Sequence, residues 1–175
     1  MTVAAIAVHN VHTRRIGADI DRVGTLIDTL AGPDDRLWPV HDWMPMRLDG
    51  PIALGAIGGH GPARYRVTGY QPGRWVRFGL VGPGFLRGFH EFSVHPCGSD
   101  VTELHHTLAV RLGILGWPIY PLVFKPLHDT VIEQALDRAE CDVHGIVVSP
   151  AATSWWFRML RALMTRYLRI LDRRG

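Results

Sequence analysis

The sequence lacks the patterns that mark most secreted, membrane-spanning and disulfide-rich proteins. It has two cysteines, Cys97 and Cys141, which fit neither a disulfide framework nor a zinc knuckle and favour a reducing, cytoplasmic setting. Residues 1–8 are apolar but have no preceding basic region, which predicts no export signal, and residues 3–15 are expected to form a first strand. The longest uncharged stretch, residues 112–124, is too short to cross a bilayer and contains two prolines.

Lysine is nearly absent, and the positive charge is unevenly distributed. Lys125 is the only lysine among 19 basic residues, and the arginines form no basic stripe interleaved with aromatics. Residues 151–175 hold six arginines and one aspartate, a net +5, whereas residues 1–150 hold 13 basic and 15 acidic residues, a net −2. The sequence therefore predicts no nucleic-acid partner, and it divides into a body, residues 1–148, and a basic tail, residues 149–175.

The common catalytic signatures are missing as well. The sequence has no His-Glu-x-x-His or Cys-x-x-Cys motif, and no serine lies in a Gly-x-Ser-x-Gly elbow. The glycine-rich residues 55–61 lack the Lys-Ser/Thr ending of a phosphate loop and the spacing of a dinucleotide-binding turn, so they predict a bend or bulge. These absences predict no cofactor and no metal.

What the sequence has is a ladder of antiparallel strands over residues 62–112, each with one apolar face. Gln71-Pro72-Gly73-Arg74 suits a type II turn, because proline fixes a negative φ and glycine accepts the positive φ that follows. That turn predicts three facing pairs: Tyr70 with Trp75, Val67 with Phe78, and Tyr65 with Leu80. Arg66 and Arg77 fall on the opposite, solvent-facing side.

A later hairpin reverses through residues 96–100. If Gly98 is its centre, the facing pairs are Val94 with Thr102, Phe92 with Leu104, and His90 with His106. Leu108 and Val110 continue the apolar face. On the outer face, the same register sets Glu91 opposite His105.

Helical patterns flank the ladder. Asp19 is a candidate cap for a helix over residues 20–30, and a second short helix is expected before a strand at residues 44–48. After the ladder, apolar residues recur at helical spacing over residues 127–139. Thr130-x-x-Glu133 fits a capping box, although the prolines at 118 and 121 allow an earlier start.

This order of elements resembles the helix-grip fold of the START-related superfamily, called SRPBCC. The resemblance covers residues 3–143. Its strongest local matches are Tyr70-Gln71-Pro72-Gly73-Arg74, Pro126-Leu127-His128-Asp129, Ile132-Glu133 and Leu136-Asp137-Arg138-Ala139-Glu140. These segments resemble bacterial members that are polyketide cyclase- or dehydrase-like. It implies an α+β fold in which a curved antiparallel sheet of about seven strands wraps around a long C-terminal helix, with two short helices after the first strand. A hydrophobic cavity is expected between sheet and helix.

The inward face predicts a mostly apolar pocket with a small polar cluster. The expected ligand-binding residues are Tyr65, Val67, Phe78, Leu80, His90, Phe92, Leu104, His106, Leu108, His128 and Ile132. His90 and His106 are candidate general acids or bases, because imidazole titrates near neutrality, and Tyr65 is placed to orient a carbonyl. The alternative, a hydrogen-bonded packing role for both histidines, is the more common arrangement. A metal reading would add Asp129 or Glu133 to the two histidines, but their spacing matches no tight motif.

Two classes of function fit this pocket. The favoured one is binding or carriage of a hydrophobic small molecule such as a lipid, polyketide or isoprenoid. The second is a cyclase, aromatase or dehydratase-like enzyme that uses the pocket histidines.

The tail predicts a basic amphipathic helix over residues 154–172. Its apolar side is formed by Trp156, Met159, Leu160, Leu163, Met164, Tyr167, Ile170 and Leu171, and arginines occupy the other side. Such a helix packs on its own body or on a second copy as a homodimer, which is the commoner outcome, or it lies on an anionic membrane surface as a peripheral contact.

Overall fold

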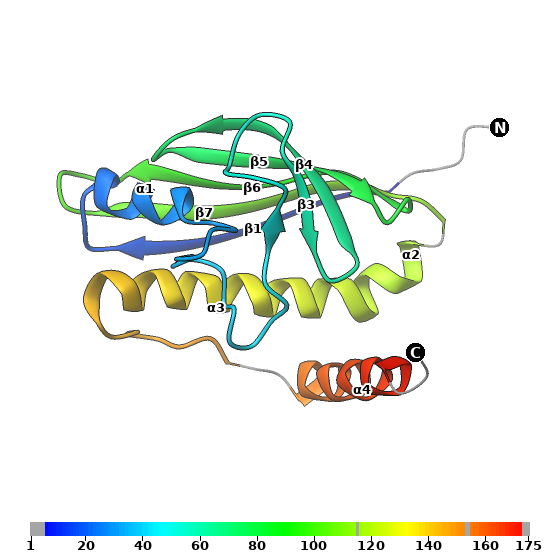
Figure 1. Ribbon diagram of the computed structural model, residues 1–175. Helices are drawn as coiled ribbons and strands as arrows, with labels where there is room; N and C mark the ends of the chain where they lie inside the picture. The colour runs from blue at the N-terminus through cyan, green and yellow to red at the C-terminus, as the bar shows by residue number, and fades with distance from the viewer. Residues whose placement is uncertain (1–5, 115, 153–154, 173–175) are drawn as a thin grey trace.

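The protein is an α+β structure in which one curved sheet covers a long helix (Figure 1). The computed structural model describes residues 6–114, 116–152 and 155–172, without the side chains of residues 164–172. Its seven antiparallel strands follow the order β1-β7-β6-β5-β4-β3-β2, so the first strand crosses over to pair with the last. The helix-grip arrangement expected from the sequence is confirmed.

The bounds of the elements follow the predicted order. The strands are β1 (Ile6–Ile16), β2 (Arg47–Leu48), β3 (Ile57–His60), β4 (Ala63–Gln71), β5 (Trp75–Gly82), β6 (Leu86–Pro96) and β7 (Thr102–Leu112). The helices are α1 (Ile20–Asp28), α2 (Gly116–Ile119), the π-helical turn η1 (Tyr120–Phe124), α3 (Lys125–His144) and α4 (Trp155–Asp172). Residues 3–5, expected in the first strand, lie outside the described residues.

The segment after α1 differs from the expectation of two short helices. Asp19 caps α1 as predicted, since its Oδ1 accepts the Arg22 backbone N–H at 2.8 Å. The second helix is wrong, because the described residues 29–46 form turns. The buried carboxylate of Asp35 accepts the backbone N–H groups of Leu37 and Trp38 at 2.9 and 2.7 Å. A local side chain thus takes donors that a helix would have bonded to its own backbone.

α1 docks closely on the turn between β4 and β5. A Cβ added at Gly24 would lie 2.0 Å from the Gly73 carbonyl oxygen, so only glycine fits there. Asp28 Oδ1 accepts the Gly73 N–H at 2.8 Å and the Tyr70 hydroxyl at 2.9 Å. These contacts anchor the helix to the turn.

The turn at residues 71–74 forms as predicted, but the register beside it is partly wrong. The Arg74 N–H donates to the Gln71 carbonyl at 3.0 Å and Gly73 has a φ of 65°. The pairs Val67 with Phe78 and Tyr65 with Leu80 are confirmed, whereas Tyr70 faces Val76. A β-bulge between residues 67 and 69 adds one residue to β4 and shifts the pairs near the turn.

The register of β6 and β7 is offset by two residues from the prediction. His90 faces Leu108, Phe92 faces His106, and Val94 faces Leu104. Glu91 correspondingly faces Thr107 instead of His105. The hairpin extends from Pro96 to Thr102, which moves its centre from residue 98 to residue 99. Because side chains alternate with period two, an offset of two keeps every inward residue inward.

The long helix starts earlier than the Thr130 capping box would place it, so that cap is wrong. Residues 116–144 form one continuous helical segment, and Thr130 Oγ1 donates inside it to the Pro126 carbonyl at 2.8 Å. In the π turn, the Lys125 N–H donates to the Tyr120 carbonyl five residues earlier. Gly145, with a φ of 74°, ends α3.

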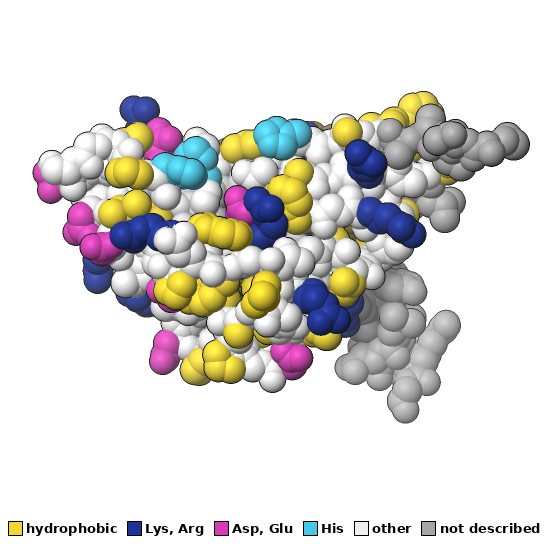
Figure 2. Space-filling model, turned by 90° about the horizontal axis from the view of Figure 1, so that it is seen from above, with side chains coloured by type: hydrophobic (Ala, Val, Ile, Leu, Met, Phe, Trp, Pro, Cys, Tyr) yellow, Lys and Arg dark blue, Asp and Glu magenta, His cyan; other side chains and the backbone are white. Residues whose placement is uncertain are grey.

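The core lies between the sheet and α3, and α1 closes one end. The largest fully buried side chains of this core are Trp38, Tyr65, Phe78 and Phe92. A smaller cluster, formed by Leu86, Leu108, Val110, Leu112 and Tyr120, lies toward α2. Figure 2 shows the outer face of the sheet, where arginine, histidine and acidic side chains are distributed among hydrophobic ones.

The first turns of α4 pack on the body, on the side of α3 away from the sheet (Figure 1). Phe157 is 2% exposed and its ring lies 5.5 Å from that of Trp43. Trp156 Nε1 donates to the Leu122 carbonyl at 2.9 Å, while Trp155 remains exposed. The side chains of Met164, Tyr167, Ile170 and Leu171, expected on the apolar side, lie outside the described residues. Among the described helices, none combines the length and apolar character needed to cross a membrane.

Candidate functional site

A group of polar rings lies between the inner face of the sheet and α3. We call it the interior histidine cluster, and its members are His60, Tyr65, His90, His106 and His128. His90 Nδ1 and His106 Nε2 share a hydrogen bond at 3.4 Å, even though the two residues are not directly opposite. The ring of Tyr65 lies 5.1 Å from that of His90, and the ring of His128 lies 5.0 Å from that of His106. Strands β4, β6 and β7 and helix α3 thus bring together the four polar residues predicted from the sequence, which are Tyr65, His90, His106 and His128.

The apolar residues expected around this cluster are also inward. Tyr65, Val67, Phe78, Phe92 and Leu104 are fully buried, Ile132 and Leu108 are nearly so, and Leu80 is partly buried. The ring of Phe78 stacks on His90 at 4.9 Å, and that of Phe92 meets His106 edge-on at 4.7 Å. The histidines are therefore enclosed by aromatic side chains.

His60 belongs to the cluster but was missed in the sequence. It ends β3, its Nδ1 shares a hydrogen bond with the Tyr65 hydroxyl at 3.1 Å, and its ring lies 4.6 Å from that of Trp38. The glycine run before it predicted a bend, and a run of glycines hides the alternation that marks a strand. No other local signal points to His60.

Burial keeps the cluster uncharged. It lowers the pKa of His60 to about 4 and lowers the pKa values of His90 and His106 well below 6.5, because a charged imidazolium loses its hydration there. Burial likewise lowers the pKa of His128 and raises the pKa of the Tyr65 hydroxyl. At neutral pH each histidine in the cluster is therefore a neutral ring with one donor and one acceptor.

Several buried polar atoms near the cluster have no hydrogen-bond partner among the described residues. They are His106 Nδ1, both ring nitrogens of His128, and the hydroxyl oxygen of Tyr120. An unsatisfied buried polar atom costs about 1–3 kcal/mol, and folded proteins have few of them. Their concentration beside one group of rings distinguishes this interior from an ordinary core.

A second polar group joins the edge strand β1 to α3, and we call it the β1–α3 seam. Its residues are Asn10, His12 and Arg14 on β1 and Asp129, Glu133, Asp137 and Glu140 on α3. Arg14 lies 2.7 Å from both Asp137 and Glu140, and His12 Nδ1 lies 2.6 Å from Glu133 Oε1. Sequence reasoning missed the seam, although two signals were present: the β1 residues alternate, and the acidic residues recur at helical spacing.

A cleft of about 710 Å³ opens along this seam. It lies between β1, α3 and the segment that follows α3, and it is lined by Arg14, Arg15, Asp129, Thr130, Glu133, Glu140, Val148, Ser149, Pro150, Ala151 and Ala152. Asp129 lines the cleft, and the next residue toward the N-terminus, His128, belongs to the interior histidine cluster.

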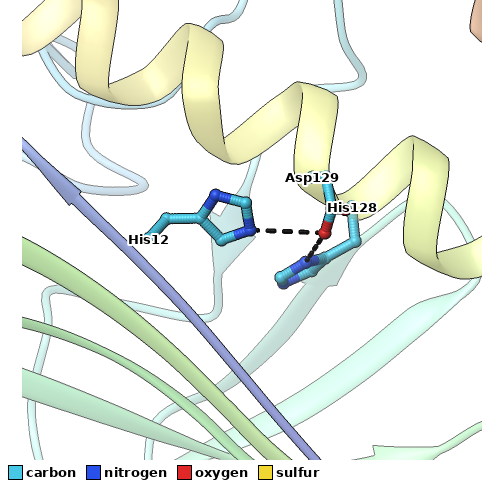
Figure 3. Close-up of side chains that lie close together, drawn as sticks. All are labelled: His12, His128 and Asp129. Carbon is cyan, nitrogen blue, oxygen red and sulfur yellow. Dashed lines mark hydrogen bonds and ion pairs between the residues drawn. The ribbon is translucent and has the colours of Figure 1, made fainter.

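Three side chains of types that can bind a metal ion meet where the seam and the cluster join. His12, His128 and Asp129 each offer one ligand atom, and these atoms lie within 4.8 Å of one another. Figure 3 shows His12 reaching from β1 and His128 from α3 toward the carboxylate of Asp129. Sequence reasoning had instead combined His90 and His106 with an acidic residue.

Comparisons with known proteins support the fold and go no further. No protein-family model matches the sequence, and no curated protein is detectably similar to it. Among solved structures, truncated norcoclaurine synthase from Thalictrum flavum is 13% identical, with 82% of this chain and 98% of that chain covered and a TM-score of 0.61. CalU16 from Micromonospora echinospora is 15% identical, with 100% and 98% covered and a TM-score of 0.57.

A third similar structure is a conserved protein of unknown function, EF2215 from Enterococcus faecalis. It is 12% identical, with 97% of this chain and 92% of that chain covered and a TM-score of 0.56. Identities this low carry no residue-level inference, whereas coverage of nearly whole chains means that the architecture is shared throughout. The protein therefore shares the fold of these structures, which is the helix-grip arrangement described above.

Proposed function

We propose that the protein binds a largely apolar small molecule between the sheet and α3, with a polar group of that molecule held by the interior histidine cluster. The observation that carries the proposal is the set of buried polar atoms without partners, above all His106 Nδ1 and the ring nitrogens of His128. A ligand hydroxyl or carbonyl placed there would satisfy atoms that otherwise destabilise the fold.

The chemistry of the lining selects the class of ligand. Neutral imidazoles donate and accept single hydrogen bonds, and the surrounding Phe78 and Phe92 offer apolar surface. A fully charged ligand would pay a large desolvation cost among these rings. The expected ligand is therefore a neutral lipid, polyketide or isoprenoid-like molecule with one or two oxygen atoms.

One of the similar structures has been solved with small molecules bound. Norcoclaurine synthase from Thalictrum flavum has been solved in complex with dopamine and hydroxybenzaldehyde, and that structure has a TM-score of 0.56 to this chain at 14% identity. Small aromatic molecules are thus bound by another protein with this fold. The fold alone does not determine which ligand a protein binds.

Two neighbouring residues of β5 provide a test with a matched control. Leu80 is partly buried on the inward face, whereas Val81 is 61% exposed on the other. We expect Leu80→Trp to crowd the interior and to weaken binding of the neutral apolar fluorophore N-phenyl-1-naphthylamine at least tenfold, while Val81→Trp leaves it unchanged. Equal fluorescence titrations for both variants and the wild type would contradict an interior binding site.

A specific observation also favours an enzymatic alternative, a cyclase, aromatase or dehydratase-like reaction. His90 and His106 form a hydrogen-bonded pair of neutral rings at 3.4 Å, and the nearby Tyr65 hydroxyl stays protonated. A neutral histidine is the form that accepts a proton from a bound ligand, although the lowered pKa values of this pair make it a weaker base than free imidazole. Replacing both histidines by glutamine separates the two functions, because binding with lost turnover supports an enzyme and unchanged binding and turnover removes the histidines from either role.

A further inference from the structure

We propose that His12, His128 and Asp129 bind one divalent transition-metal ion of the Zn²⁺ type at the inner end of the β1–α3 cleft. This site adds a metal to the proposed ligand-binding function and does not depend on it. It rests on the spacing of the ligand atoms, the lack of other partners for His128, and the way Glu133 holds His12.

The spacing of the three side chains is close to that of a bound site. Zn²⁺ binds nitrogen and oxygen at about 2.0–2.1 Å, and a tetrahedral arrangement then separates neighbouring ligand atoms by about 3.3 Å. His12 Nε2 lies 3.3 Å from Asp129 Oδ1, and His128 Nδ1 lies 3.7 Å from the same oxygen (Figure 3). All three ligand atoms lie within 4.8 Å of one another.

His128 supplies an independent observation. Both of its ring nitrogens are buried and neither has a hydrogen-bond partner among the described residues. A ring nitrogen with a free lone pair is what histidine offers to a metal ion. A metal on Nδ1 would give this nitrogen a partner.

His12 is held as metal-binding histidines usually are. Its Nδ1 lies 2.6 Å from Glu133 Oε1, and a histidine that donates one N–H to a carboxylate directs the lone pair of its other nitrogen at the metal. In that tautomer, the lone pair of Nε2 faces the Asp129 carboxylate across 3.3 Å, so a metal ion between them would bind both.

The carboxylate of Asp129 is held in place by two neighbours. Lys125 and Asn10 both contact it, and Asn10 Nδ2 donates to Oδ1 at 3.0 Å. Asp129 and Glu133 line the cleft, which gives an ion a route from solvent. Three protein ligands leave a fourth position open for water or for an oxygen atom of a bound molecule.

The test must first remove a competing surface group. His95 and His105 have ring centroids 4.5 Å apart on the outer face, and His105 Nε2 lies 3.0 Å from Glu103, so this pair can bind metal adventitiously. The parent protein for the experiment is therefore the His105→Asn variant. Metal-stripped protein is titrated calorimetrically with Zn²⁺ and spectroscopically with Co²⁺, whose visible bands report tetrahedral coordination.

We expect the parent to bind one equivalent of Zn²⁺ with a dissociation constant of about 1 µM or lower. His128→Asn or Asp129→Asn in that parent should weaken binding by more than about 100-fold, and Glu133→Gln by about 10- to 100-fold, because Glu133 orients His12 without touching the metal. Circular dichroism of the metal-free variants confirms folding, and Asp129→Asn keeps the shape of the side chain if His128→Asn does not fold.

Two results would overturn the site. If the parent binds no Zn²⁺, the three side chains do not form a metal site. If His128→Asn and Asp129→Asn fold and bind as tightly as the parent, the metal lies elsewhere. Both readouts use the protein without any organic ligand, so failure here leaves the proposed ligand binding untouched.

Discussion

The buried neutral histidines should make the protein unusually sensitive to mild acid. In the unfolded chain each histidine takes up a proton below a pKa of about 6.5. In the folded protein His60 takes it up only near pH 4, and burial also lowers the pKa values of His90 and His106 well below 6.5. The unfolded state therefore binds more protons between these values, and the free energy of unfolding falls as the pH is lowered from 7 toward 4.

The size of the effect follows from the pKa of His60. A group whose pKa moves from 6.5 in the unfolded chain to about 4 in the folded one lowers stability by about 2 kcal/mol between pH 7.5 and pH 5.0. His90 and His106 add to this in the same direction. A total of several kcal/mol is a large part of the stability of an ordinary domain.

Urea denaturation at pH 7.5 and pH 5.0, with a chelator present, measures the difference. We expect His60→Gln to reduce the loss on acidification by about 2 kcal/mol, whereas His9→Gln, at an exposed position of β1, retains the full loss. Equal stability of the wild type at the two pH values, or an undiminished loss in His60→Gln, would refute the reasoning that these rings are buried and neutral.

Three further predictions concern the seam, the α1 contact and the tail. Arg14→Met should cost about 3 kcal/mol in urea denaturation, because it leaves a buried carboxylate unpaired, and Arg15→Met, whose ion pair is exposed, less than about 1 kcal/mol. Gly24→Ala should lower the free energy of unfolding by about 1–3 kcal/mol, whereas a Cβ at the control position in Gly50→Ala meets no other atom. Equal melting temperatures of the two variants would contradict the close helix contact. We propose that α4 also contacts anionic membranes. Trp155→Ala, which changes an exposed side chain, should therefore reduce co-sedimentation with anionic vesicles. A wild type that does not bind such vesicles but sediments as a dimer would favour a second copy on this face.

Local patterns predicted the parts of the fold that local physics determines. The Pro-Gly turn at residues 71–74 and the Asp19 cap each depend on a few neighbouring atoms, and both form as expected. The hairpin at residues 96–102 has no comparable turn pair at its centre, so its length could not be read from the sequence and the register was offset by two. The inward positions of His90 and His106 survived because alternation depends only on parity.

The seam escaped prediction because it depends on contacts between distant segments. Arg14 and Glu140 are far apart in the sequence, and their pairing requires β1 to lie at the sheet edge beside α3. Polar residues on a strand are usually taken as solvent-facing, which hid Asn10 and His12. A stripe of acids at helical spacing opposite alternating polar residues on a strand is the signal that identifies such a seam.

The central claim is that the interior holds an apolar molecule through the histidine cluster. Native mass spectrometry of the protein purified from its own host tests it most directly, with His90→Gln/His106→Gln beside the wild type. We expect the wild type to retain a neutral, hydrophobic molecule of defined mass and the double variant to retain much less of it. A wild type that is free of bound molecules in every preparation, and that captures none from a lipid extract of the host, would contradict the claim.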